Sequence, residues 1–307
     1  MGEFPARIVA QDFVTPPEFA AWRLAPEGSG RIGGARFSLK NRDGEARVAQ
    51  LYEQIPIRVS PLQFGPAEPT LVYLINPTAG LLDGDAHLIE IHAEANTRTV
   101  VTGQSASRMH PCLKGFCTQQ WNVKVDDGAV LVILPGPAIP FAGTRFFQRV
   151  HVELGRDARL IWGDLWFAGR YARADASEQF RFECIIQEMA VQREGKLVYR
   201  DRFTWRGPWT DDAAHWYFAG QPAAGSIFVT GDIATDSLTQ VEDSRAATFT
   251  TFAGDTCCRF VGPSDRVVHA VVQSSLRLAS TLTSGAGHSP WLMKGHHLAP
   301  VHWFGVP

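Results

Sequence analysis

The 307-residue chain has little cysteine, little excess charge and no long apolar run. Its five cysteines are an odd, scattered number, unlike the dense, even framework of a small secreted domain. The 29 basic and 31 acidic residues nearly cancel, so no bulk positive field is available to hold nucleic acid or an anionic membrane. No apolar segment reaches the about 18 residues that a spanning helix needs, and the N-terminus lacks the pattern of a secretory signal. We therefore expect a cytoplasmic protein that binds neither nucleic acid nor membrane.

Signatures of catalysis are also missing from the sequence. There is no G-x-S-x-G nucleophile elbow and no phosphate-binding loop that ends in G-K-(S/T). The glycines at 33–34 and at 80 and 84 lie at expected hairpin bends and not between a strand and a helix, so they do not form a dinucleotide site. The sequence therefore favours a non-catalytic protein with no tightly bound cofactor.

What the sequence does contain is a repeated strand–turn–strand pattern. Three such units run from 89–92 to Gly103, from 123–128 to Gly136, and from 150–153 to Gly163. Units that recur at this spacing stack on one another and bury faces that none could bury alone. Because 45% of the residues are hydrophobic, a sizeable core is available. We predict an all-β protein of stacked strand layers, resembling a solenoid or sandwich, with a short C-terminal helix.

The boundaries of this organisation follow from turns and composition. Glycine turns predict hairpins at 41–44 and at 194–195, and apolar residues at 180, 182, 184 and 186 predict one buried face of a strand. Ser264 can cap a helix that Gly285 would stop. We predict an N-terminal arm over 1–30, laid on the body or left loose, a β-stack over 31–206, and a C-terminal part over 207–307. The joint lies within 207–225, where no strand period is visible.

One loop carries three possible soft metal ligands. His110, Cys112 and Cys117 fall within eight residues, so a single loop could offer an imidazole and two thiols to nickel, copper or zinc. The alternative is that the cysteines are small packed residues and His110 lies on the surface. A second group, the histidines at 296, 297 and 302, lies near the C-terminus and favours adventitious metal binding.

A second candidate lies in the glycine-rich turn. Asp83, Asp85 and His87 alternate, so in an extended segment they point to one face and could pass a divalent cation between oxygen and nitrogen ligands. The alternative is that Asp83 and Asp85 form turns by binding their own backbone.

Five motifs in order across roughly 30–205 resemble those of the UreD (UreH) family of urease accessory proteins. Residues 76–85, N-P-T-A-G-L-L-D-G-D, are similar to the family's N-P-P-G-G-L-V-G-G-D, and 101–108 are similar to T-T-x-x-A-T-K. Residues 139–145, I-P-F-A-G-T-R, resemble I-P-F-x-G-(S/A)-R, and W-G-D at 162–164 with G-R at 169–170 resembles W-E-(I/V)-x-x-x-G-R. The resemblance implies a structural or partner-binding role for the motif residues Gly80, Gly84, Arg108, Phe141, Gly143, Arg145, Trp162, Gly169 and Arg170.

The resemblance implies a scaffold or chaperone that has no turnover of its own. It implies binding to the urease apoprotein, in a complex with a UreF-type accessory protein and a UreG-type GTPase, and transient passage of Ni²⁺. By position, Asp85 and Asp164 match the acids thought to line the nickel path in the family, although Asp164 could instead pair with Arg170. Asp83 replaces a family glycine and Arg108 replaces a lysine, which indicates a divergent member.

Two other functions remain open at this point. A β-solenoid enzyme acting on a polysaccharide could use Asp83, Asp85 and Arg108 as an acid–base cluster on one face. A UreD-like interaction protein could keep the fold without nickel transfer. The chain has 9 tryptophans, some of which are candidates for partner-facing anchors.

Overall fold

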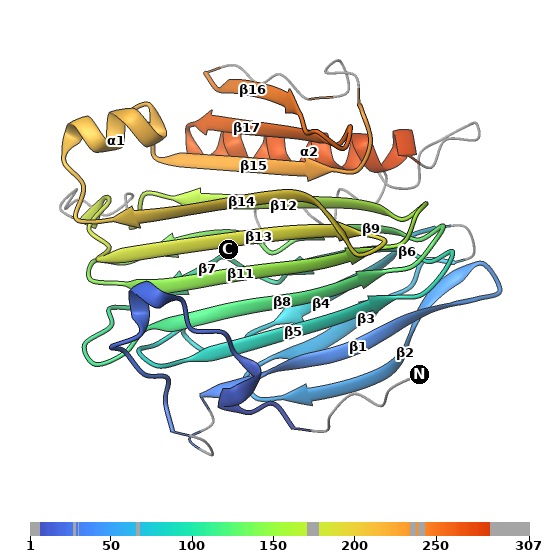
Figure 1. Ribbon diagram of the computed structural model, residues 1–307, viewed down its shortest axis with the longest axis horizontal. Helices are drawn as coiled ribbons and strands as arrows, with labels where there is room; N and C mark the ends of the chain where they lie inside the picture. The colour runs from blue at the N-terminus through green and yellow to red at the C-terminus, as the bar shows by residue number, and fades with distance from the viewer. Residues whose placement is uncertain are drawn as a thin grey trace.

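The computed structural model describes residues 7–26, 29, 31–65, 68–170, 178–233, 238 and 243–282. These residues form two large β-sheets and two α-helices, which confirms the predicted all-β class (Figure 1). The seven-stranded sheet has the order β14 (Lys196–Arg206), β13 (Cys184–Arg193), β11 (Arg145–Leu154), β8 (Cys117–Val125), β5 (Ala86–Ala93), β1 (Ile32–Arg42), β2 (Glu45–Gln54).

The ten-stranded sheet packs face to face against the seven-stranded sheet and lies behind it in the view of Figure 1. Along its main path the order is β16 (Arg245–Thr250), β17 (Thr256–Gly262), β15 (Ala223–Val229), β12 (Arg159–Phe167), β9 (Val130–Leu134), β6 (Arg98–Gly103), β4 (Thr70–Ile75), β3 (Arg58–Leu62). Two short strands, β10 (Pro137–Pro140) and β7 (Ser107–Met109), continue from the end of β12.

The three repeated units form the centre of the molecule. In each unit the first strand lies in the seven-stranded sheet and the second in the ten-stranded sheet: β5 then β6, β8 then β9, β11 then β12. Neighbouring units pair in parallel in both sheets. This is the stack that the glycine spacing predicted. The strands β1, β4 and β13 continue its parallel pairing, and the strands β2, β3, β14 and β15 then pair antiparallel.

The main hydrophobic core lies between the two sheets. Alternation along each strand sends every second side chain inward, so Ile89, Trp121, Val150 and Met189 from four neighbouring strands enter one cluster. Trp162 reaches this cluster from the other sheet, and its ring meets that of Trp121 edge to face at 5.3 Å between centroids. These contacts fix the separation and register of the two sheets.

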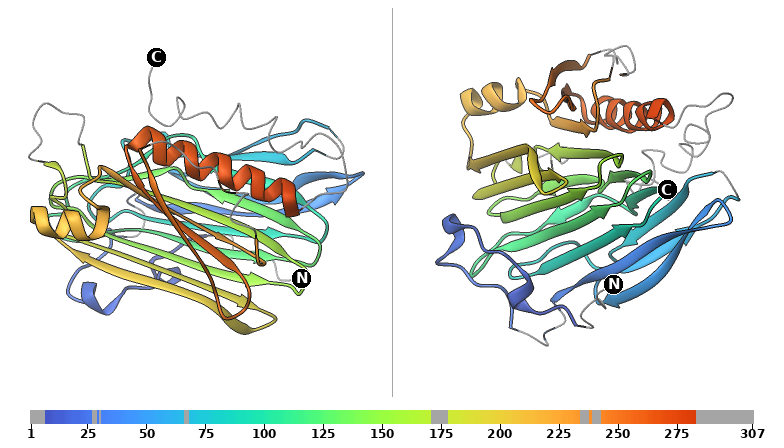
Figure 2. Two further views of the ribbon diagram at one scale, coloured as in Figure 1. Left: turned by 90° about the horizontal axis from the view of Figure 1, so that it is seen from above. Right: turned by 45° about the vertical axis from the view of Figure 1, so that its right-hand side comes forward.

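Both outer faces are covered. The arm over 7–26, which contains the short 3-10 turns Ala10–Asp12 and Pro17–Phe19, lies against the seven-stranded sheet, and α2 (Ser264–Leu282) lies on the opposite side of the molecule (Figure 2). Arg36 on β1 is buried and binds Asp12 of the arm and Glu90 of β5. The inner face of α2 packs into a second apolar cluster with β12, β15 and β17.

Several local predictions can be compared with these elements. The hairpin turns are confirmed: Asp43 and Gly44 have φ of 55° and 84°, and Glu194 and Gly195 have φ of 48° and 74°. The helix begins at Ser264 as predicted, whereas Gly285 and the histidines at 296, 297 and 302 lie outside the described residues.

The segment 207–225 and the strand at 180–186 depart from expectation. A helix, α1 (Asp211–Phe218), stands in the segment where we expected only irregular chain, and Thr210 caps it by accepting from the Ala213 N–H. The strand β13 begins only at Cys184. The prediction that residues 180, 182, 184 and 186 form one buried face of a strand is therefore wrong, because Phe180 and Phe182 pack with Ile185 and not with Cys184. No helix among the described residues is long and apolar enough to cross a membrane.

Candidate functional site

A row of polar side chains crosses the interior of the sandwich. His87, Gln119, Gln148 and Gln187 occupy matching positions on β5, β8, β11 and β13. Each is two residues before an inward-facing core residue on its own strand, so all four face the other sheet. Asp164 of β12 completes this polar row from the ten-stranded sheet.

Hydrogen bonds connect one half of the polar row. The amide of Gln187 donates to Oε1 of Gln148 at 2.8 Å and to Oδ2 of Asp164 at 2.7 Å. The indole N–H of Trp162 donates to the same Asp164 oxygen at 2.7 Å, while that of Trp121 donates to Gln119 Oε1 at 3.2 Å. The two indoles, which meet edge to face, therefore border the polar row on the side of the main core, and each contributes a donor to it.

Asp164 is a buried carboxylate with no cationic side chain bound to it in the hydrogen bonds and ion pairs of the described residues. Its residue is 6% exposed, and burial raises the pKa of its carboxyl from 3.8 to about 6, against the opposing effect of the Trp162 and Gln187 hydrogen bonds. Pairing with Arg170 was wrong, because that guanidinium binds Glu178. Asp164 also lines a small cavity that Tyr199 borders from β14.

His87 lies at the opposite end of the polar row from Asp164. It is 1% exposed, and neither ring nitrogen has a hydrogen-bond partner in the part of the chain that the structure describes. Burial lowers the pKa of its imidazole from 6.5 to about 4, so the ring is neutral at neutral pH and keeps a free lone pair. A buried polar group without a partner requires an explanation, and a ligand is one such explanation.

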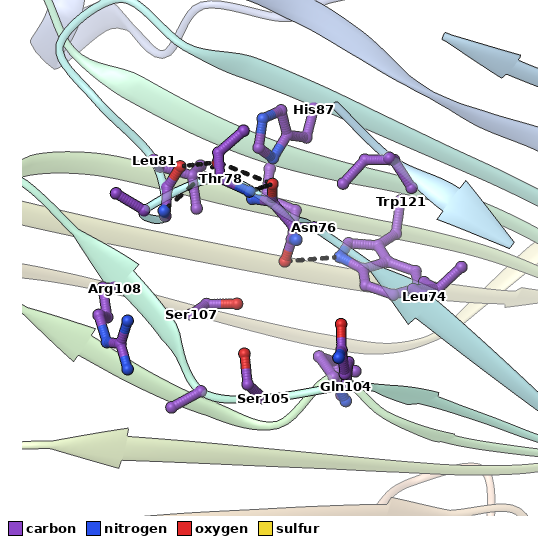
Figure 3. A pocket seen from close by; sticks show the side chains of 17 residues that line it. Leu74, Asn76, Thr78, Leu81, His87, Gln104, Ser105, Ser107, Arg108 and Trp121 are labelled. Carbon is purple, nitrogen blue, oxygen red and sulfur yellow. Dashed lines mark hydrogen bonds between the residues drawn. The ribbon is translucent and has the colours of Figure 1, made fainter. Parts of the chain in front are cut away.

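His87 lines a cavity of about 50 Å³ (Figure 3). His87 and Trp121 approach it from the seven-stranded sheet, and Ser105, Ser107 and Arg108 lie across from them. Hydroxyl, amide and imidazole groups thus line a space large enough for a few water molecules.

The structure does not bring Asp83 and Asp85 to His87. Both oxygens of Asp83 accept hydrogen bonds from the backbone N–H groups of residues 113–115, at 2.8 to 2.9 Å. Asp85 accepts from the Leu82 N–H at 2.7 Å and pairs with Arg31 at 2.9 Å. Asp85 therefore bonds its own turn, as the alternative interpretation held, whereas Asp83 binds the backbone of a neighbouring loop and not its own.

The predicted soft-metal ligands do not converge either. Among the described residues no group of three or more His, Cys, Asp or Glu side chains could hold a metal ion. The ring of His110 packs against Phe141 and its Nε2 lies 3.1 Å from the carbonyl oxygen of Ala79. Cys112 and Cys117 lie together, buried and away from that ring.

The remaining motif residues stabilise the loops at the end of the sandwich that carries the glycine-rich turn. Gly80 has φ of 126°, and a Cβ there would lie 2.2 Å from the carbonyl oxygen of Arg108. The Arg145 guanidinium binds Glu183 at 2.6 Å and donates to the Gly115 carbonyl at 3.1 Å. These contacts tie the glycine-rich turn, the cysteine loop and β11 together.

A second group of contacts surrounds Phe141. The Arg170 guanidinium lies 4.2 Å from the centroid of that ring, and the Phe141 N–H donates to the Met109 carbonyl. Gly84, Gly143 and Gly169 all have positive φ, of 88°, 73° and 118°. The motif glycines therefore stand where the chain turns between the sheets.

Motif-based reasoning missed Gln119, Gln148 and Gln187. Each interrupts an apolar alternation that continues two residues later, at Trp121, Val150 and Met189 respectively. A polar residue in the inward phase of a strand is the signal that could have identified them, but only once the strands are known to be adjacent.

Comparison with known proteins gives a consistent result. Residues 31–292 match the family model described as UreD urease accessory protein. Urease accessory protein UreD 2 of Synechococcus sp. strain JA-3-3Ab is 32% identical over 209 residues, which cover 66% of this chain and 75% of that protein. UreD of Magnetococcus marinus is 31% identical, with 67% and 71% covered, and UreD 3 of Methylorubrum populi is 31% identical, with 54% of each covered. The chain therefore belongs to the UreD family of urease accessory proteins.

Proposed function

We propose that this chain binds apo-urease, together with UreF-type and UreG-type partners, and that Ni²⁺ crosses its interior along the polar row. Family membership gives the coarser part of this function, a role in urease maturation as an accessory factor and not as the enzyme. The observation that carries the finer part is the polar row itself, because unpartnered and charged groups rarely lie between two hydrophobic sheets without a function.

The chemistry of the polar row suits a borderline cation. Neutral imidazole is a good ligand for Ni²⁺, and amide and carboxylate oxygens are weaker, exchangeable ones. His87 offers the first at one end, and Gln148 and Asp164 offer the others further along. We infer that the ion is held loosely and is not retained as a cofactor.

Surface aromatic groups support the binding of partners. Trp216 and Tyr217 of α1 are 83% and 49% exposed, and the ring of Tyr217 contacts those of Trp205 and Trp209. Exposed tryptophan and tyrosine are the residues that most often anchor protein interfaces. We propose that the accessory partner covers this aromatic surface.

A cytoplasmic location is part of the same proposal. All five cysteines are buried free thiols, including two that lie together, as is usual in a reducing compartment.

The alternative function as a polysaccharide-acting enzyme loses its support. It needed Asp83 and Asp85 as free acid and base groups, but backbone N–H groups and Arg31 occupy their oxygens.

The test is the Asp164→Asn variant, which removes a charge and keeps the shape. We expect the variant to co-purify with its partners normally but to yield urease with at least severalfold less nickel and activity. The matched control is Asp157→Asn, an exposed aspartate on the loop before β12, which should behave as wild type. Normal nickel loading by Asp164→Asn would overturn the conduit and leave an interaction protein without nickel transfer.

A further inference from the structure

The two cysteines of the loop between β7 and β8 form a pair that the proposed nickel route does not use. The thiols of Cys112 and Cys117 both donate to the carbonyl oxygen of Arg145, at 3.5 and 3.6 Å. When Cys112 is ionised, the single S–H of Cys117 can turn to donate to the Cys112 sulfur instead. Both side chains are buried, with residue exposures of 3% and 0%. The other three cysteines offer no such pair. Cys184 lies in a different apolar cluster, and the neighbouring Cys257 and Cys258 on β17 belong to two further apolar clusters on opposite faces of the strand.

We propose that Cys112 and Cys117 are a reversible thiol–disulfide pair. The Cys112 thiolate attacks a peroxide, whose O–O bond breaks, to give a sulfenic acid and hydroxide. The Cys117 thiolate then displaces the sulfenic oxygen, forming the S–S bond. Two thiols and one hydrogen peroxide thus become one disulfide and two waters, and a dithiol reductant of the thioredoxin class reverses the step.

The roles of the two sulfurs follow from their surroundings. The hydrogen bond from Cys117 lowers the pKa of the Cys112 thiol, and the nearby Arg145 acts in the same direction. Complete burial raises the pKa of Cys117, and the carboxylate of Asp85 adds to that effect. A thiol with thiolate character beside a resolving thiol is the usual arrangement of redox-sensitive cysteines. Cys112 itself is buried, but the next residue, Leu113, is 82% exposed, so the loop that carries Cys112 lies at the surface.

The pair lies at a junction that oxidation would alter. The loop between the two cysteines supplies the three N–H groups that Asp83 binds, and its Gly115 carbonyl accepts from Arg145. A disulfide draws the sulfurs to about 2.05 Å and removes both S–H donors from the Arg145 carbonyl. We infer that the reduced form, in which these contacts are complete, is the form that supports urease activation. This last step rests on the proposed function.

The chemical test is a peptide map of the full chain. Trypsin cuts after Lys114, between the two cysteines, so their peptides stay joined only if a disulfide links them. After hydrogen peroxide we expect the joined peptide, about 2 Da lighter than the sum of its parts, and its loss with dithiothreitol. Cys184, Cys257 and Cys258 are the internal controls and should remain thiols. Oxidation of those controls as fast as the pair, or no joined peptide, would overturn the proposal.

Two single variants test the order of attack. In Cys117→Ser, dimedone should label Cys112 after peroxide, whereas in Cys112→Ser it should leave Cys117 unlabelled. Equal dimedone labelling of the two variants would refute the assignment of Cys112 as the attacking thiol. If a variant fails to fold, the peptide map of the wild-type chain still tests whether the disulfide forms.

Regulation is tested separately from the chemistry. Urease activation by the oxidised chain should fall severalfold and recover with reductant, while Cys112→Ser with Cys117→Ser should be insensitive to peroxide. An unchanged activation by fully cross-linked chain would overturn regulation alone, and a chain that never activates urease would instead refute the proposed function.

Discussion

Replacing Asp164 by asparagine should make the protein more stable at neutral pH and worse at its function. Burial raises the pKa of this carboxyl from 3.8 to about 6, so the folded state favours the protonated form. At 1.36 kcal/mol per pKa unit, keeping the carboxylate ionised in the fold costs about 3 kcal/mol. Asparagine carries no charge, and its single carbonyl oxygen can take the place of Oδ2, which accepts from both Trp162 and Gln187.

The sign of the pH dependence is fixed by the raised pKa. The favourable contribution of the protonated carboxyl is fully present below pH 3.8 and is lost as the pH rises through about 6. Between about pH 5 and about pH 8 the wild type should therefore lose on the order of 1 kcal/mol of stability relative to the variant. An unpaired amide N–H of the new asparagine costs about 1–3 kcal/mol, but that cost is the same at both pH values.

Urea unfolding of both chains at the two pH values, with midpoints and slopes compared, is the measurement. The Asp164→Glu variant serves as a charge-conserving control and should retain the wild-type slope with pH. A stability gap that stays constant or narrows from about pH 5 to about pH 8 would refute the reasoning, because it would mean that Asp164 is not a strained, buried carboxylate.

Three further predictions concern other residues. Asp85→Asn should lower the free energy of unfolding by about 1–3 kcal/mol, because it weakens a half-buried pair with Arg31 and a turn cap. An unchanged urea midpoint would contradict this, and Asp157→Asn is the control. Under reducing conditions, Cys112→Ser with Cys117→Ser should leave metal content and urease activation within about twofold of wild type, since no third ligand among the described residues completes a site. Stoichiometric metal, measured by elemental analysis, that disappears in the double variant would contradict this. Trp216→Ser should change the free energy of unfolding by less than about 0.5 kcal/mol but weaken partner binding at least about tenfold. Leu113→Ser, an equally exposed control, should leave both stability and partner binding unchanged. Equal partner affinity of Trp216→Ser and wild type in a titration would mean that the aromatic surface lies outside the interface.

Local pattern and family motifs predicted much of the fold. The spacing of the glycines indicated the stacked units, and positive-φ turns such as Asp43 with Gly44 were readable because few residues adopt that conformation. The helix α1 was missed because its eight residues follow Gly207 and Pro208 closely and show no long apolar period. Its stability comes from Phe218, which packs into an aromatic cluster formed by distant segments.

The candidate site was less predictable, for a physical reason. Asp164 was named from its motif, but its partners, Trp162 and Gln187, depend on which strand of the other sheet lies opposite. Likewise, alternation put Asp85 and His87 on one face, whereas Asp85 is turned to Arg31 at the strand end. Contacts between sheets are set by tertiary packing, which strand periodicity does not encode.

The parallel stacking of the units also determines the step length of any ion that crosses the interior. Because the polar row runs across the strands, each step from one residue to the next equals the spacing of neighbouring strands, about 4.8 Å. Metal–ligand bonds to nitrogen and oxygen are about 2.0–2.2 Å, so an ion midway between two neighbours is within reach of both. From His87 on β5 to Gln187 on β13 the polar row contains three such steps, each from one strand to the next. The β-stack thus divides a crossing of about 14 Å into equal transfers in which the ion never has to be released into a hydrophobic core.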